Sequence, residues 1–297
     1  MRDAGFTEVV FADDLNAFKA FDLATSNEEV QTAAKNCQKN LHSWGRANQV
    51  NFENTKESLH VFSHRFPQGE DFKLLGVHFD CKLAMETAVH KLAGEAHWKL
   101  RTLLRAAKYH CDADLVLLYK SRLLGYLEYR TPALYHASDT TLQALDKVQE
   151  KLLRVVGCTE REALQHWNLA PLSTRRDIAL LGLVHRTVLG KGPKHFGRFF
   201  QRKAPAQPSF WTRAAERRHD KQLEEVVYPN CPELLRGSAL GLVRVYNWLP
   251  ADTVRATTVK EFQFNLQNLV RERARSNCKD WVRTFSPRLP WWNHPLR

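Results

Sequence analysis

Two adjacent carboxylates, Asp13 and Asp14, are the residues of this chain whose types and spacing point most directly to chemistry. They follow the β-rich segment 6–11 and precede a second such segment, 16–21, so the sequence predicts a β-hairpin with an acidic turn. Carboxylates on a tight turn can hold Mg²⁺, which prefers oxygen ligands and often bridges to substrate phosphates. Aspartate also favours turns because its side chain bonds nearby amides, so a purely structural turn stays open as the alternative.

A helix and two further strands are predicted to position this turn. Ser26 or Asn27 caps the helix, whose apolar residues recur at helical spacing as far as Trp44. Strand-like runs follow at 58–63 and 72–79, so residues 1–80 are predicted to form a small α+β unit.

The chain from about residue 83 onward is predicted to be helical almost throughout. The predicted helices lie near 92–104, 115–134, 139–156, 178–189, 209–226, 238–247 and 258–275. Trp98, like Trp44 before it, fits an apolar helix face and is expected in the core. Segment 201–208 is the best linker candidate. The expected fold class is α+β and predominantly α, with boundaries at 1–80, 81–200 and 201–297.

Charge is unevenly distributed along the 297 residues. The formal net charge is +12, with −3 over residues 1–100 and +15 over residues 101–297. A basic region of this size would attract a polyanion, and its interleaved aromatic residues suit nucleic acid. For any single cluster, a solvated helix face remains the alternative. The candidate nucleic-acid-binding residues are Lys99, Arg101, Arg105, Arg175, Arg176, Arg217 and Arg218.

Several classes of protein are excluded by the same composition. No stretch approaches the ~20 consecutive apolar residues of a membrane span, and the first residues lack the features of a signal peptide. The six cysteines lie far apart without a Cys-x-x-Cys pair, so neither a disulfide framework nor zinc is predicted. A reducing intracellular setting is therefore expected, with nuclear and cytoplasmic residence equally open.

Segment 11–14, Phe-Ala-Asp-Asp, resembles the aromatic-x-Asp-Asp motif of reverse transcriptases, in the form common in non-LTR (LINE-type) retrotransposons. Segment 51–56 is similar to the turn that follows the catalytic hairpin in this family, and segment 72–77 is similar to its primer grip. Looser similarity extends over 145–154, 171–176 and 246–250. The resemblance is strongest over residues 6–80 and covers most of the chain.

This resemblance implies an RNA-directed DNA polymerase, which extends a DNA primer on an RNA template with dNTPs and two Mg²⁺ or Mn²⁺ ions. It places Asp13 and Asp14 at the metals as catalytic residues, and Lys56 beside the leaving pyrophosphate, with an exposed lysine beside a turn as the alternative for Lys56. Leu75 and Gly76 would grip the primer end, although Gly76 also suits a β-bulge.

By the same resemblance, residues 1–80 are the C-terminal half of a polymerase palm, 81–200 a helical thumb and 201–297 a basic helical extension. The family's metal site also needs an aspartate from an earlier strand, and an earlier fingers region holds the nucleotide. Only ten residues precede Phe11, and Asp80 and Asp112 fall in the primer-grip and helical regions.

The chain is therefore expected to be the C-terminal part of a reverse transcriptase that does not polymerise by itself. A non-catalytic nucleic-acid-binding module stays open as a second function. A helical protein-interaction scaffold stays open as a third.

Overall fold

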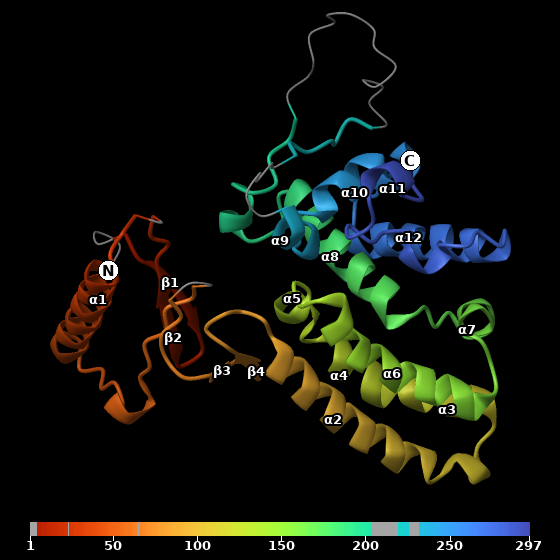
Figure 1. The fold of residues 1–297 in the computed structure, drawn as a ribbon, viewed down its shortest axis with the longest axis horizontal. Coiled ribbons are helices and arrows are strands. Elements are labelled where there is room, and N and C mark those ends of the chain that lie inside the picture. Colours follow the sequence, from red (N-terminus) through yellow and green to blue (C-terminus); the bar gives the residue numbers. More distant parts are fainter. Residues whose placement is uncertain (1–4, 23, 64–65, 204–218, 226–231) are drawn as a thin grey trace, which may run out of the picture. The chain divides into compact units, whose positions relative to one another are not determined.

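A computed structural model describes residues 5–22, 24–63, 66–203, 219–225 and 232–297. The chain forms two compact units, residues 1–70 (unit 1) and 71–297 (unit 2) (Figure 1). Helices dominate and the strands form two small antiparallel sheets, which confirms the predicted α+β, predominantly α fold class. In the described ranges, no helix combines the length and the apolar character that a membrane span requires.

Unit 1 contains the predicted hairpin. Strands β1 (Thr7–Phe11) and β2 (Asp14–Phe18) pair antiparallel with Phe11 opposite Asp14, so the turn consists of two residues, 12 and 13. The two strands form a sheet of their own, in which Phe11 is 61% exposed. The acidic turn therefore stands on a sheet whose apolar residues are poorly covered within the described part of unit 1.

Helix α1 (Asn27–Ala47) begins where the sequence predicts. Ser26 accepts from the backbone N–H of Glu29, and the Glu29 carboxylate accepts from the Ser26 backbone, a capping box. Segment 58–63 is not a strand, since it makes only an isolated bridge between Val61 and Gln68. Trp44 is 54% exposed, so its predicted place in the core is wrong.

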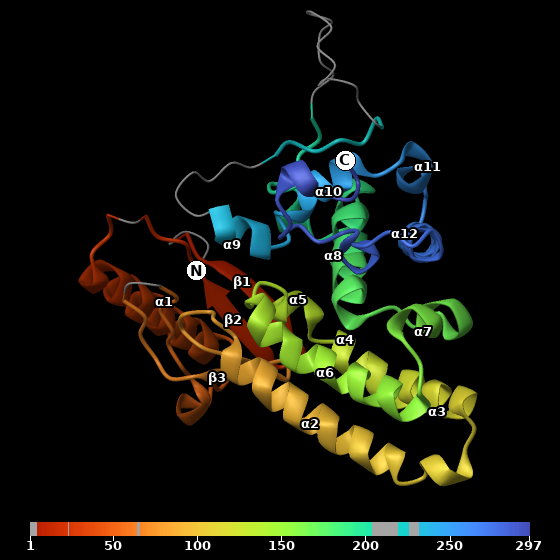
Figure 2. The same ribbon diagram turned by 45° about the vertical axis from the view of Figure 1, so that its right-hand side comes forward.

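Unit 2 begins with a second hairpin, where the sequence predicts one strand over 72–79. Strands β3 (Phe72–Leu74) and β4 (Val77–Phe79) pair antiparallel, and residues 75 and 76 form the turn between them. Helix α2 (Glu86–Leu104) follows and lies along α6 (Asp139–Val156) (Figures 1 and 2). The hairpin thus belongs to the helical unit and not to the predicted 1–80 segment.

The first apolar core of unit 2 lies between α2, α6 and the helices that connect them. These are α3 (Asp112–Tyr119), a π-helical turn (Lys120–Leu124), α4 (Gly125–Glu128) and α5 (Thr131–Leu134). Gly157 ends α6 in the left-handed conformation, as the sequence predicts. Helix α7 (Glu160–Trp167) then leads to the second core.

The second core gathers around α8 (Leu172–Val188). Its other helices are α9 (Pro232–Gly237), α10 (Leu242–Trp248), α11 (Ala251–Val254) and α12 (Val259–Arg275). Helix α8 packs against α10 and α12, and the tail 276–297 buries Trp281 and Phe285 in the same core. These contacts cross the predicted boundary at residue 200.

Most of the predicted linker 201–208 and of the predicted helix 209–226 lies outside the described residues. The described part of that predicted helix, residues 219–225, is not helical.

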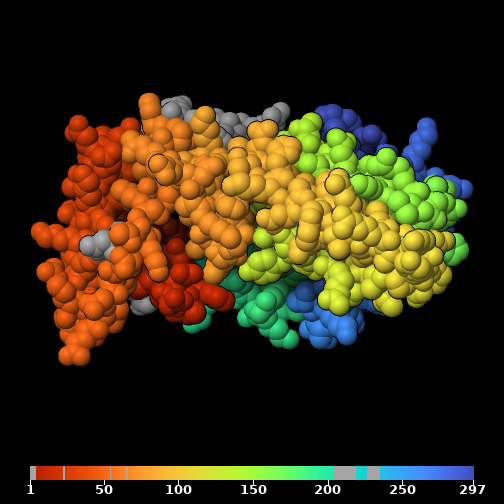
Figure 3. All heavy atoms as spheres, turned by 90° about the horizontal axis from the view of Figure 1, so that it is seen from below, coloured from red at the N-terminus to blue at the C-terminus, as the bar shows by residue number. Residues whose placement is uncertain are grey.

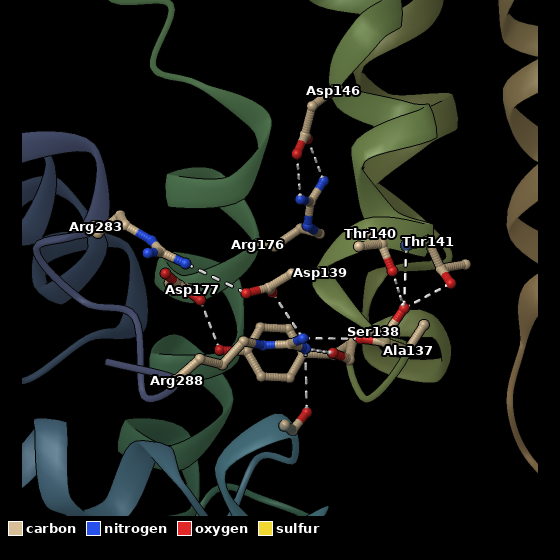
Figure 4. Close-up of polar contacts among 12 residues, drawn as sticks. Ala137, Ser138, Asp139, Thr140, Thr141, Asp146, Arg176, Asp177, Arg283 and Arg288 are labelled. Atoms are coloured by element: carbon tan, nitrogen blue, oxygen red, sulfur yellow. Dashed lines mark hydrogen bonds and ion pairs between the residues drawn. The ribbon is translucent and has the colours of Figure 1, made fainter. Parts of the chain in front are cut away.

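Buried polar groups connect α8 to its neighbours (Figure 4). Tyr135 donates its hydroxyl to Asp177 Oδ1 at 2.6 Å, and both side chains are buried. Next to it, Arg176 forms a two-pronged pair with Asp146 of α6, at 2.7 and 2.9 Å. These pairs give the polar residues of a buried helix the partners that burial requires.

The tail joins the same network through two arginines (Figure 4). Arg288 donates to Asp139 at 2.8 Å and to the carbonyl of Ala137 at 2.9 Å, and Arg283 donates to the other Asp139 oxygen at 3.3 Å. Asp139 lies in the first turn of α6, after the N-cap Ser138. The end of the chain is thereby tied to the start of α6.

Asp177 gives a prediction about stability. Burial raises the pKa of Asp177 from an ordinary 3.8 to about 6, so the native state binds its proton more tightly than the unfolded chain. The resulting stabilisation is complete below the unfolded pKa and is lost as pH rises through the native pKa. We expect Asp177→Asn, which stays neutral and still accepts from Tyr135, to raise the free energy of unfolding. The gain should grow from ~1 kcal/mol at about pH 4.5 to ~3 kcal/mol at about pH 7.5, measured by urea unfolding.

Asp252→Asn is the matched control, because Asp252 is exposed and pairs with Arg255, three residues further along the chain. Its effect should be the same at both pH values. An Asp177→Asn gain that does not change with pH would contradict the role assigned to burial.

Candidate nucleic-acid interface

The acidic turn is built as predicted, but its donors do not complete a metal site. Ala12 adopts a left-handed φ of +54°, and Asp13 and Asp14 are both exposed. Within the described residues, no group of three or more Asp, Glu, His or Cys side chains could hold a metal. Two Mg²⁺ or Mn²⁺ ions need more oxygen ligands than this pair supplies, so the residues present do not fit the two-metal centre.

The other acids considered from the sequence have structural roles. Asp80 accepts hydrogen bonds from the backbone N–H groups of Lys82, Ala84 and Met85, at 2.7–3.1 Å, and so shapes the loop before α2. Asp112 lies in the first turn of α3.

Lys56, the lysine that the resemblance places beside the pyrophosphate, is exposed at the end of the short 3₁₀ helix Asn54–Lys56 in unit 1.

The predicted primer-grip residues form the tip of the β3–β4 hairpin. Leu75 and Gly76 both have positive φ, +47° and +81°, the φ pattern of a type I′ turn and not of a β-bulge. A leucine is strained in this conformation, at a cost of about 1–2 kcal/mol. Leu75 is nevertheless exposed, and a Cβ added to Gly76 would meet nothing within 4 Å. The tip therefore presents open backbone and an apolar side chain to the surroundings.

Two residues that follow α4 hold the tip in place. Tyr129 donates its hydroxyl to the Leu75 carbonyl at 3.4 Å, and Arg130 donates its Nε–H to the Gly76 carbonyl at 3.2 Å. The Arg130 guanidinium also lies over the ring of Tyr126, 4.8 Å from its centroid. The strained turn is thus fixed from the helical side.

Tyr126 extends this cluster to α2. The ammonium of Lys99 lies 4.9 Å from the centroid of the same ring, and the Tyr126 hydroxyl bonds to Glu95. Arg130 also pairs with Glu95 at 3.9 Å. Contacts therefore run from the backbone of the hairpin tip through residues 126–130 to side chains of α2, and of the residues involved the sequence predicted Lys99, Leu75 and Gly76.

The hairpin is surrounded by positive charge. Burial lowers the pKa of His78 on β4, and the neighbouring charges of Lys91 and Lys73 lower it further. Arg130 acts in the same direction and Glu95 opposes it. Among the neighbouring charges, three cations lower this pKa and one acid raises it, so positive charge predominates around His78 and would favour a bound anion.

Helix α2 presents a row of cations around an exposed tryptophan. Lys91, Trp98 and Arg105 are seven residues apart, so they share one face of the helix, with Arg101 beside them. Figure 3 shows α2, in yellow, lying at the surface of unit 2. Trp98 is 65% exposed, so its predicted place in the core is wrong. Leu100 and its neighbours occupy the buried face instead.

Not all of the predicted nucleic-acid-binding residues reach this surface. Arg176 is buried and paired with Asp146, and Arg175 pairs with Glu128, so both already have carboxylate partners inside unit 2. This placement argues against the predicted phosphate contacts of Arg175 and Arg176. Arg217 and Arg218 lie outside the described residues.

Sequence reasoning missed part of this surface. We define the hairpin–α2 surface by Lys73, Leu75, Gly76, Lys91, Trp98, Lys99, Arg101, Arg105 and Arg130. The seven-residue spacing of Lys91, Trp98 and Arg105 was a readable signal, because it separates Trp98 from the leucine stripe. Arg130 left no such signal, since only the fold brings it to Gly76.

The turn conformation gives a prediction. Asparagine favours positive φ more than leucine does, so we expect Leu75→Asn to raise the free energy of unfolding by ~0.5–1 kcal/mol. Gly76→Ala should lower it by ~1 kcal/mol although its Cβ meets no neighbour, because only the backbone conformation opposes it. Chemical denaturation of both variants measures the two changes. Equal stability of Gly76→Ala and the parent would show that the turn is not held at positive φ.

No family model, curated protein or solved structure matches the chain. The resemblance to reverse transcriptases is therefore carried by the short motifs alone. Of these, segment 11–14 forms a hairpin turn and segment 72–77 forms a second hairpin.

Proposed function

We propose that this chain is a nucleic-acid-binding part of a non-LTR retrotransposon reverse transcriptase, which holds a template–primer on the hairpin–α2 surface. The exposed Trp98 within a row of cations on α2 is the observation that supports this most directly. A large aromatic ring exposed among positive charges has no packing role, but it suits base stacking beside phosphate contacts.

The hairpin tip contributes to the same surface. Open backbone at Gly76 lets a nucleic-acid strand approach closely, and Arg130 and Tyr129 keep the strained turn in one conformation. The cations of α2 would then contact phosphates along the strand, and Trp98 would stack on an unpaired base. The resemblance implies that the bound nucleic acid is an RNA template with a DNA primer.

Polymerisation by this chain itself is not part of the proposal. Asp13 and Asp14 have no third metal-binding side chain among the described residues, so we derive no catalytic step from them. The acidic turn remains a carboxylate pair that would need a further ligand to align two ions. The described residues accordingly support nucleic-acid binding without catalysis.

Binding can be tested with a matched pair of triple variants. Lys91→Gln/Arg101→Gln/Arg105→Gln removes three charges from the surface. We expect it to reduce the slope of log affinity against log salt by about 2–3 for an RNA·DNA duplex with an RNA overhang, because three phosphate contacts are lost. Trp98→Ala should weaken binding by about 5–100-fold through lost stacking. Fluorescence anisotropy measures both.

The control triple, Arg236→Gln/Arg255→Gln/Lys260→Gln, removes the same charge from exposed positions on and next to α9, α11 and α12. Its salt slope should match the parent. If the two triples lose affinity equally, binding is a property of net charge and not of this surface. If the parent binds no nucleic acid near physiological salt, the protein-interaction scaffold is the better reading.

A primer-extension assay tests the polymerase activity. We expect no extension of a DNA primer on an RNA template by the 297-residue chain with dNTPs and either Mg²⁺ or Mn²⁺. An active reverse transcriptase serves as the positive control. Extension that Asp13→Asn abolishes would overturn the view that the acidic turn is not competent here.

A further inference from the structure

A pocket of about 510 Å³ lies at the end of α12, where the tail returns to the helix. Its lining residues are Arg273, Cys278, Lys279, Asp280, Trp292, Asn293, His294, Pro295 and Arg297. None of them belongs to the hairpin–α2 surface. The volume falls within the range of small-molecule sites, roughly 300–1,000 Å³.

The pocket lining is positively charged. Arg273, Lys279 and Arg297 contribute cations, and Asp280 contributes an acid. Arg273 donates an Nη–H to the Pro295 carbonyl at 2.7 Å, which fixes its guanidinium, while its Nε is buried and has no hydrogen-bond partner among the described residues. Because Arg273 lines the pocket, an anionic oxygen bound there would meet a guanidinium that the Pro295 carbonyl already holds in place.

An aromatic side chain lines the same pocket. Trp292 is 64% exposed, and its ring meets that of Trp291 edge to face, with centroids 5.9 Å apart. The guanidinium of Arg297 lies 4.6 Å from the centroid of the Trp291 ring. Trp292 thus presents indole surface beside cations. This arrangement suits a ligand in which a planar ring is joined to a negatively charged group.

The wall of the pocket is fixed by His294. Its Nε2 donates to the Ser286 carbonyl at 3.2 Å, and its Nδ1 accepts from the Leu296 backbone N–H at 3.2 Å. Burial lowers the pKa of His294 to about 4, so the ring is neutral and both nitrogens stay engaged at neutral pH. These two bonds hold the chain at His294 without a ligand, so this wall would need no rearrangement on binding.

We propose that this pocket binds a nucleoside phosphate, with the phosphate on Arg273 and Lys279 and the base stacked on Trp292. Cations alone would suit any anion, and tryptophan alone any planar ring; their combination in one pocket favours a molecule that carries both. A free nucleotide and the 5′-phosphorylated end of a strand share this chemistry. The site lies apart from the hairpin–α2 surface, so it does not depend on the function proposed above.

Calorimetric titration of the full chain tests the site with AMP, adenosine and inorganic phosphate as probes. We expect AMP to bind at least about tenfold more tightly than either fragment. Trp292→Ala and Lys279→Ala, both at exposed positions, should each weaken AMP binding by about fivefold or more. Arg236→Gln and Lys260→Gln, at exposed positions outside both the pocket and the hairpin–α2 surface, should leave it unchanged.

To identify the source of the nucleotide, oligonucleotides are titrated into the Lys91/Arg101/Arg105 triple variant, in which binding at the hairpin–α2 surface is weakened. There, tighter binding of a 5′-phosphorylated than of a 5′-hydroxyl oligonucleotide identifies a strand end, and equal binding identifies the free nucleotide. The proposal is overturned if AMP does not bind, if phosphate alone binds equally well, or if neither pocket variant weakens binding. None of these results would contradict the proposed nucleic-acid binding by the hairpin–α2 surface.

Discussion

The burial of α8 between two apolar cores is the interaction on which unit 2 depends. Leu172 belongs to the core of α2 and α6, whereas Leu181 belongs to the core of α10 and α12. A helix enclosed in this way cannot leave polar groups unpaired, since each unpaired buried group costs about 1–3 kcal/mol. Thr174, Asp177 and His185 accordingly bond to the tail, to Tyr135 and to Tyr246. The same bonds tie the tail and α10 to the centre of the unit.

This constraint divides the cations of unit 2 into two kinds. Arg176 lies on the buried helix, so a carboxylate must neutralise it, and its charge serves the fold. Helix α2 is buried on one side only. Packing therefore does not determine which residues occupy its outer face around Trp98 and Arg101. Exposed aromatic and basic residues on such a face need another explanation, and contact with a ligand supplies one.

In unit 1, by contrast, the candidate site lies on an element that is poorly buried. Its acidic turn stands on a two-stranded hairpin, an arrangement that is marginally stable on its own, and apolar residues such as Phe11 stay exposed. The hairpin of unit 2 is equally small, yet Arg130 and Tyr129 brace its strained tip from the helical side. Of the two hairpins formed by segments that resemble a polymerase, the primer-grip hairpin is thus the one whose turn is held by side chains of a neighbouring helical segment.

The sequence by itself determined the features that depend on interactions between neighbouring residues. The hairpin turn at Asp13, the capping box at Ser26 and the stop of α6 at Gly157 each follow from neighbouring residues. Tertiary structure decided the rest, because partners far along the chain compete for the same groups. Arg176 and Arg101 read alike as basic residues on helices, but only the fold supplies Asp146 to one and solvent to the other. Charge and spacing name the candidates for binding, and the contacts across the core determine which of them can reach a ligand.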